Sequence, residues 1–188
     1  MNTEENKKTS VAKELFHFVL YLLGVLLATY LIIHFVGQRT VVIGDSMRET
    51  LHDGDSLVVD KISYRFTEPE RYDIVVFPYE YEEDTYYIKR VIALPHETVQ
   101  IDDEGNIFVD GELLDEHYGR EVIEYAGNAS EPITLGDDEY FVLGDNRNES
   151  EDSRFEDVGL IKREKIIGRA IFRIYPFSAV GKIKNGNN

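Results

Sequence analysis

An uncharged apolar run near the N-terminus constrains this chain more than any other feature. Residues 15–36 read LFHFVLYLLGVLLATYLIIHFV, 22 positions without Asp, Glu, Lys or Arg. As an α-helix the run would be about 33 Å long, enough to cross a hydrocarbon core of about 30 Å. A core helix that is apolar on every side is unusual in a small domain. The run therefore predicts a transmembrane anchor over 15–36, preceded by a polar tail over 1–14.

The flanks of the run bear on how it is used. A cleaved signal peptide has a shorter apolar region followed by small residues, whereas this run continues into GQRTVV, which favours an uncleaved anchor. Three lysines lie within residues 1–14, and Arg39 and Arg48 follow the run, a balance that slightly favours a cytoplasmic N-terminus. We expect a single-pass protein in contact with cytoplasmic membrane lipid, with residues 37–188 outside the cell.

Charge and composition exclude several classes of function. The 188-residue chain has a net charge of -16. Nucleic-acid binding needs a basic surface, so this charge argues against a nucleic-acid partner. Cysteine is absent, which excludes disulfides and thiol catalysis. The five histidines are scattered without zinc spacing, so we expect neither a metal nor another cofactor.

Beyond the apolar run the hydrophobic period is mostly two, which is typical of strands. Turn signals such as HDGD, DDEGN, VDGE and LGDD separate the strand-like runs. Residues 79–84 and 115–132 read as exposed connections. The predicted fold class is mainly β, with one N-terminal transmembrane helix followed by a β-rich domain. The strand-like runs are 39–43, 56–60, 72–78, 85–94, 98–101, 106–110, 139–145 and 165–176.

One of these predicted strands carries a lysine in an unusual setting. In YYIKRVIAL, residues 86–94, both faces are apolar or aromatic apart from Lys89 and Arg90. The simpler interpretation is that both cations reach solvent or pair with carboxylates. However, burial disfavours the ammonium and lowers the pKa of a lysine. A neutral lysine amine can take the proton from a serine hydroxyl, as in the Ser-Lys variants of serine catalysis.

Two further polar stretches belong with this strand. GDSMRETL, residues 44–51, places Ser46 in a turn-like setting soon after the apolar run. GDNRNESEDSR, residues 144–154, follows an apolar strand and is dense in Asp, Arg and Ser. By itself the second stretch is typical of a solvated turn, but a Ser-Lys site needs such a loop to brace the lysine.

Together the three stretches resemble the motifs of bacterial type I signal peptidases, especially the single-span forms typical of Gram-positive bacteria. The family motifs are Ser-Met-x-Pro-Thr-Leu, Tyr-x-Ile-Lys-Arg-Val-Ile-x-Leu-Pro-Gly-Asp/Glu and Gly-Asp-Asn-Arg-x-x-Ser-x-Asp-Ser-Arg. Here they read SMRETL, YYIKRVIALPHE and GDNRNESEDSR, in that order behind an N-terminal anchor. The resemblance implies a membrane-anchored serine endopeptidase with signal-peptidase-like β structure. Such an enzyme removes signal peptides from exported preproteins, cutting after small residues at positions -1 and -3 (Ala-x-Ala).

The resemblance also assigns roles to single residues. Ser46 would be the nucleophile, Lys89 the general base, and Ser150 the hydroxyl that hydrogen-bonds and orients the lysine. The backbone N–H of Ser46 would be one oxyanion donor. Some members add a serine hydroxyl two residues earlier, where this chain has Gly44. The residues that support the site would be Asp145, Arg147, Asp152 and Arg154, and those that line the substrate pockets would be Ile43, Met47, Leu51, Tyr87 and Ile88.

Two positions depart from the family pattern. Glu49 replaces the motif's proline, and an inward-pointing carboxylate there would stabilise the Lys89 ammonium and weaken the base. On this reading Glu49→Pro should leave activity equal or higher. His96 replaces the usual glycine after Leu-Pro, which bears on the turn conformation at that point.

Two other classes of function compete with an active peptidase. A signal-peptidase-like assembly factor for surface proteins would be catalytically weak, and Glu49 is the main argument for it. Such relatives tend to lose the serine or the lysine, whereas this chain retains both. A self-cleaving repressor shares Ser-Lys chemistry and a similar fold, but it needs a DNA-binding domain where this chain has an apolar run.

Overall fold

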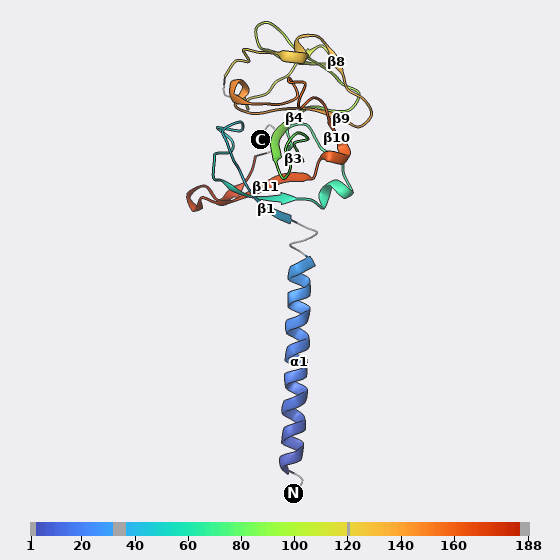
Figure 1. The fold of residues 1–188 in the computed structure, drawn as a ribbon, viewed down its shortest axis with the longest axis vertical. Coiled ribbons are helices and arrows are strands. Elements are labelled where there is room, and N and C mark those ends of the chain that lie inside the picture. Colours follow the sequence, from blue (N-terminus) through green and yellow to red (C-terminus); the bar gives the residue numbers. More distant parts are fainter. Residues whose placement is uncertain (1–2, 32–36, 120, 185–188) are drawn as a thin grey trace. The chain divides into compact units, whose positions relative to one another are not determined.

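The computed structural model describes residues 3–31, 37–119 and 121–184 (Figure 1). The chain separates into two compact units, one ending at Gly37 and the other beginning at Gln38. Among the described residues, the first contains one long helix, and the second contains the sheets and all the candidate site residues.

The N-terminal unit is built on α1 (Thr3–Leu31). The segment Lys13–Tyr30 has a mean hydropathy of 1.3, and none of it is buried within the protein. By length and composition this segment can cross a membrane, as the sequence predicts. Residues 32–36 of the expected anchor lie outside the described residues. The helix begins at Thr3, so most of the expected polar tail over 1–14 is helical. This tail contains neither Gly nor Pro, the two residues that disfavour a helix most.

The second unit contains two β-sheets, and every pairing with a defined register is antiparallel. The large sheet has the order β1-β2-β11-β3-β4-β9-β10, with β12 paired to β11, and the small sheet has the order β7-β6-β5-β8. The strands of the large sheet are β1 (Gly37–Val41), β2 (Ser56–Asp60), β3 (Ile74–Pro78), β4 (Tyr86–Ala93), β9 (Glu139–Leu143), β10 (Ile161–Lys162), β11 (Gly168–Tyr175) and β12 (Gly181–Lys182). Those of the small sheet are β5 (Thr98–Ile101), β6 (Ile107–Val109), β7 (Glu112–Leu113) and β8 (Ile133–Thr134).

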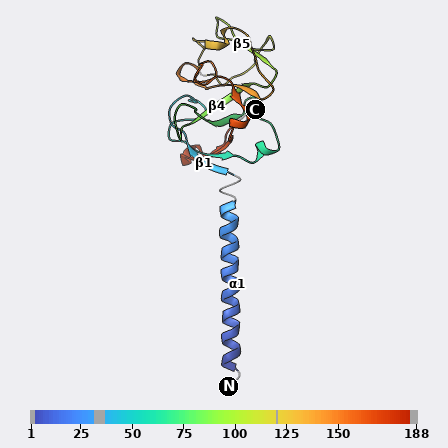
Figure 2. The same ribbon diagram turned by 45° about the vertical axis from the view of Figure 1, so that its right-hand side comes forward.

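Within this unit, β5 and β8 lie at the end opposite β1 and β11, with β4 between them (Figures 1 and 2). One core cluster joins the small sheet to β4 and β9, and includes Val99, Ile92 and Phe141. A second cluster lies around Val75 of β3. A third is centred on Leu57 and Ile74, and it receives the side chains that anchor the turn carrying Ser46.

The fold class predicted from the sequence is confirmed, and each of the eight strand-like runs overlaps a strand. The two-residue strands β7, β8, β10 and β12 lie outside these runs, because two residues are too few to show a period of two. The reading of 115–132 as an exposed connection is wrong in part. Ile123 and Ala129 from this segment are 6% and 0% exposed in the first core cluster, where they pack beside the small sheet.

Candidate active site

Ser46 lies in a tight turn that its neighbours anchor in the core. The backbone N–H of Leu51 donates to the carbonyl of Met47 at 2.8 Å, and both side chains are buried in the third cluster. Gly44 begins the turn with φ of +87°, a conformation that glycine adopts without steric cost. Its N–H donates to Asp53 Oδ1 at 2.9 Å. The turn thus holds Ser46 half-buried, at the edge of a groove.

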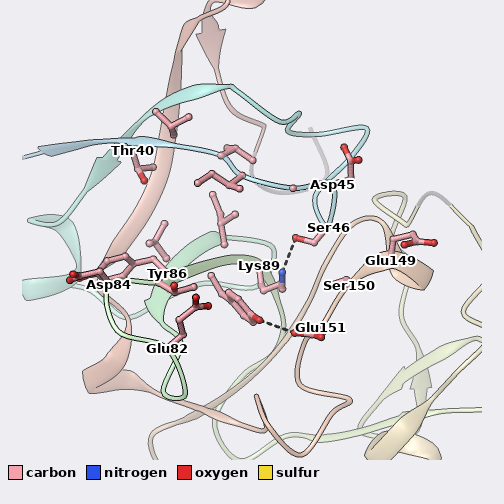
Figure 3. Close-up of a pocket in the computed structure, with 18 of the residues that line it drawn as sticks. Thr40, Asp45, Ser46, Glu82, Asp84, Tyr86, Lys89, Glu149, Ser150 and Glu151 are labelled. Atoms are coloured by element: carbon pink, nitrogen blue, oxygen red, sulfur yellow. Dashed lines mark hydrogen bonds between the residues drawn. The ribbon is translucent and has the colours of Figure 1, made fainter.

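Lys89 meets Ser46 from the middle of β4. Its Nζ lies 2.8 Å from Ser46 Oγ, and the two side chains face one another in Figure 3. Lys89 is 3% exposed, and burial lowers its pKa to about 8 against the opposing charges of Asp152 and Glu151. Every residue of β4 from Lys89 to Ala93 is buried, so both faces of the strand are covered there. The result is an amine with a pKa of about 8 beside a serine hydroxyl.

The loop after β9 braces both the turn and the strand. Asp145 accepts hydrogen bonds from Arg90 Nε at 2.8 Å and Nη2 at 2.7 Å, and from Thr50 Oγ1 at 2.5 Å. Asn146 donates through its backbone N–H to the carbonyl of Ser46 at 3.0 Å, and through Nδ2 to the carbonyl of Asp45 at 3.1 Å. The residues on either side of Ser46 are therefore tied to the strand that carries Lys89.

The two arginines predicted to support the site are almost completely buried. Arg154 pairs with Asp152 through Nε at 2.7 Å and Nη2 at 2.9 Å. Arg147 donates from Nε to the carbonyl of Gly144 at 3.0 Å and pairs with Glu116. Buried charges of this kind must be paired and hydrogen-bonded, because leaving one unpaired costs several kcal/mol. The loop is thus a folded ionic core and not a solvated turn.

Ser150 does not make the contact expected of it. Its side chain is buried and lines the same groove as Lys89, but its Oγ has no hydrogen-bond partner among the described residues. The expected hydrogen bond to Lys89 is therefore not seen in this structure. Ser150 instead packs against Gly144, where an added Cβ would come within 2.2 Å of Ser150 Oγ and 2.5 Å of the Ser46 carbonyl oxygen. Only glycine fits between them.

Ser46 and Lys89 lie in the lining of a groove with a volume of about 1060 Å³. Three of the predicted substrate-binding residues, Ile43, Tyr87 and Ile88, line it. Met47 and Leu51 are 1% and 0% exposed, belong to the core beneath the turn, and are not among the lining residues. Their part of the prediction is not supported, because the turn uses these apolar side chains as anchors.

The two departures from the family motif occur at left-handed backbone positions. Glu49 has φ of +82° and His96 has φ of +70°. The usual glycine fits the second position, because glycine reaches positive φ without strain. Proline cannot replace Glu49 in this conformation, since its ring fixes φ near −65°. The φ of Glu49 therefore argues against the expectation that Glu49→Pro leaves activity equal or higher. Glu49 is exposed and is not among the main charges acting on Lys89.

Sequence reasoning missed three residues that this geometry depends on. Thr50, Asn146 and Gly144 all lie inside the quoted motifs, but only their positions were noted and no role was assigned to them. Their roles depend on contacts between segments that lie 95 to 101 residues apart, which local patterns do not reveal. Among the described residues, no group of three or more His, Asp or Glu side chains is arranged to hold a metal ion.

Comparison with known proteins shows which family this chain belongs to. The family model described as "Signal peptidase, peptidase S26" matches residues 14–175. The chain belongs to the signal peptidase family. Its activity is that of a signal peptidase I, a serine endopeptidase that cleaves signal peptides from secreted preproteins, and its apolar helix anchors it to a membrane.

Relatives cover most of the chain. Signal peptidase I of Bacillus licheniformis is 34% identical to this chain, and the match covers 95% of this chain and 98% of the relative. Signal peptidase I T of Bacillus subtilis (strain 168) is 35% identical, and the match covers 97% of this chain and 96% of the relative. The probable signal peptidase I-2 of Synechocystis is 41% identical over 78% of this chain and 67% of its own. A crystal structure of a signal peptidase I from Enterococcus faecalis V583 aligns with 55% of this chain and 97% of that chain, at 31% identity and a TM-score of 0.45.

Proposed function

We propose that Ser46 is the nucleophile and Lys89 the general base of this signal peptidase. The observation that carries the proposal is the 2.8 Å contact between Lys89 Nζ and Ser46 Oγ, with the lysine buried and its pKa lowered to about 8. Burial of the side chain favours the neutral amine, which can accept a proton. Asp145, Arg147, Asp152 and Arg154 would hold the two segments in place.

In the proposed reaction Ser46 Oγ attacks the carbonyl carbon of the scissile bond while its proton passes to Lys89 Nζ. The backbone N–H of Ser46 stabilises the oxyanion that forms. The C–N bond then breaks, and the Lys89 ammonium gives its proton to the departing amine of the mature protein. Water next attacks the acyl ester. Lys89 accepts the proton of this water, and the proton returns to Ser46 as the signal peptide leaves.

The substrate preference is proposed from the groove. An extended peptide laid beside β1 and β4 would place its small side chains against Ile43, Tyr87 and Ile88, in the way that a peptide adds to a sheet edge. The resemblance to the family motifs implies small residues at positions -1 and -3. We therefore propose cleavage after Ala-x-Ala or similarly small residues.

The domain limits and orientation are also proposed. Residues 1–14 would lie in the cytoplasm, 15–36 would cross the membrane among its lipids, and 37–188 would form the extracellular protease domain. Ser46 follows the apolar run by about ten residues, so the anchor would hold the site near the outer membrane surface, where signal peptides emerge. Protease added to intact cells should then digest an epitope tag at the C-terminus and spare one at the N-terminus.

The decisive experiment is cleavage of a precursor with an Ala-x-Ala site, in detergent, by the wild type, Ser46→Ala and Lys89→Met. Product should appear only with the wild type, cut after the last alanine. Ser178→Ala and Lys162→Met are matched controls, because both side chains are exposed and remain outside the groove lining. Circular dichroism should show all five proteins folded. Cleavage by Ser46→Ala or Lys89→Met at the wild-type rate would refute the assignment.

A further inference from the structure

Residues 115–119, here called the strap, lie across two buried arginines of the site. The Tyr118 ring centroid lies 3.6 Å from Arg90 Cζ, so the guanidinium stacks on the ring face. Glu116 receives both terminal nitrogens of Arg147, each at 2.9 Å. Gly119 packs so closely on Arg147 that an added Cβ would lie 3.2 Å from its Cζ. The strap therefore contacts the site through defined interactions and is more than a connection.

The nitrogens of Arg90 donate hydrogen bonds to groups outside the strap. Its side chain is 0% exposed, and besides Asp145 it donates from Nη1 to the carbonyl of Tyr72 at 2.9 Å. The flat face of a guanidinium cannot form such hydrogen bonds, and an aromatic ring is the partner that best covers it in a desolvated place. Tyr118 supplies that ring, and Tyr72 packs on Tyr118 with ring centroids 5.3 Å apart.

Arg90 is in turn connected to both proposed catalytic segments. It is adjacent to Lys89 on β4, and through Asp145 it reaches Thr50, whose hydroxyl donates to the same carboxylate at 2.5 Å. Thr50 belongs to the turn that carries Ser46, where its N–H donates to the carbonyl of Met47 at 3.1 Å. A shift of the Arg90 guanidinium would therefore move Asp145 and, with it, one end of the turn.

We infer that Tyr118 is a positioning residue of the peptidase, which acts through Arg90 and Asp145 to fix the distance between Ser46 and Lys89. This inference rests on the proposed roles of Ser46 and Lys89. The aromatic ring of Tyr118 holds Arg90 in position, and the Tyr118 hydroxyl has no part in this. The Tyr118 hydroxyl is buried without a hydrogen-bond partner among the described residues, whereas the ring has the arginine on its face. Glu116 keeps the ring in place by pairing the strap to Arg147.

The test compares Tyr118→Leu with Tyr118→Phe in the full-length enzyme in detergent, using the Ala-x-Ala precursor. Leu fills similar space without a π face, and Phe keeps the face without the hydroxyl. Tyr118→Leu should lower kcat about tenfold with KM within about twofold, because misplacement of reacting groups affects the chemical step. Tyr118→Phe should recover most of that loss. His117→Ala is the control within the strap, since that side chain is 81% exposed, and it should match the wild type.

A double-mutant cycle separates positioning from a general loss of structure. If Tyr118 acts through Asp145 and Thr50, Tyr118→Leu combined with Thr50→Val should be little worse than the poorer single variant. Multiplied losses would mean independent effects and would overturn the inference. So would wild-type kcat in Tyr118→Leu, or a Phe variant as impaired as the Leu variant.

A second variant covers the case in which Tyr118→Leu does not fold. Glu116→Gln keeps the size of the side chain and weakens the pairing with Arg147, so it should lower kcat about threefold in a folded protein. Unchanged kcat in a folded Glu116→Gln would then overturn the inference. Ser46→Ala, assayed in parallel, tests the proposed function separately. If it still cleaves, the dyad is wrong, and if it is inactive while the strap variants are fully active, only this inference fails.

Discussion

Lys89 Nζ lies 2.8 Å from Ser46 Oγ, although the two residues are 43 positions apart and belong to separately anchored segments. The serine turn is anchored in the core by Met47 and Leu51. The lysine strand is paired on both sides, to β3 at Val75 and to β9 next to Lys89 at Arg90. Two rigid supports of this kind can hold a reacting pair within hydrogen-bond distance without help from bound substrate.

The pKa of Lys89 predicts how cleavage depends on pH. The base is active only when neutral, and with a pKa of about 8 roughly a tenth of it is neutral at pH 7. The rate should therefore rise about tenfold per pH unit below pH 8 and level off above it. Measuring kcat/KM for the Ala-x-Ala precursor from pH 6 to 9.5 checks this. A flat profile, or a rise that continues toward pH 10.5, would contradict the assignment of Lys89 as a buried base.

The charge of Glu151 should shift the midpoint of this pH profile. It accepts a hydrogen bond from Tyr87 at 2.8 Å, and its charge is among those that raise the pKa of Lys89 against the larger effect of burial. Glu151→Gln keeps an acceptor for Tyr87 and removes the charge, so the pKa of Lys89 should fall. Activity at pH 7 should rise by about two- to fivefold, less at high salt.

The exposed Glu112 in the small sheet offers a matched control for this prediction. Glu112→Gln also removes one negative charge, so it reports the effect of net charge alone. The pH profile of Glu112→Gln should match that of the wild type. A midpoint for Glu151→Gln at the wild-type position or higher would show that Glu151 does not act on Lys89.

Much of this site could be predicted because its residues lie in contiguous motifs. The catalytic candidates, the anchor and the eight main strands all follow from local patterns. The strap could not be predicted in this way. Tyr118 lies in a stretch without periodicity, and its role depends on Arg90, which is distant in sequence. For Arg90 the sequence suggested only contact with solvent or pairing with a carboxylate, and the structure pairs it with Asp145. Met47 and Leu51 were assigned to the groove because apolar residues near a nucleophile suit either a pocket or a core.

The backbone at Glu49 makes a prediction opposite to that of the motif. With φ of +82°, a residue with a Cβ is strained by about 1 kcal/mol or more, and glycine is not. Glu49→Gly should therefore raise Tm by about 2–4 °C, whereas Glu49→Pro should lower it and reduce cleavage. Glu49→Ala removes the carboxylate and keeps the Cβ, so Glu49→Gly should have the higher Tm of these two variants, and their difference measures the backbone effect. A more stable Pro variant would show that this turn has a different backbone conformation.

Asn146 should prove as important as the residues of the ionic core. Its side-chain amide donates to the carbonyl of Asp45 at 3.1 Å, directly before the proposed nucleophile, and it is 3% exposed. Asn146→Asp keeps the shape but removes the donor and places a charge against a carbonyl oxygen, so kcat should fall at least tenfold. Asn146→Ala should lose less activity than Asn146→Asp, because it leaves the Asp45 carbonyl without this donor but adds no charge.

Asn106, which bonds Asp102 in the exposed turn between β5 and β6, is the control for Asn146. Asn106→Asp should cleave at the wild-type rate, because that turn belongs to the small sheet. Both Asp variants should be assayed at the same pH with the Ala-x-Ala precursor, and their thermal unfolding should be compared. Equal activity in Asn146→Asp and the wild type would mean that the serine turn keeps its geometry without this amide, and that the backbone bond from Asn146 to Ser46 suffices.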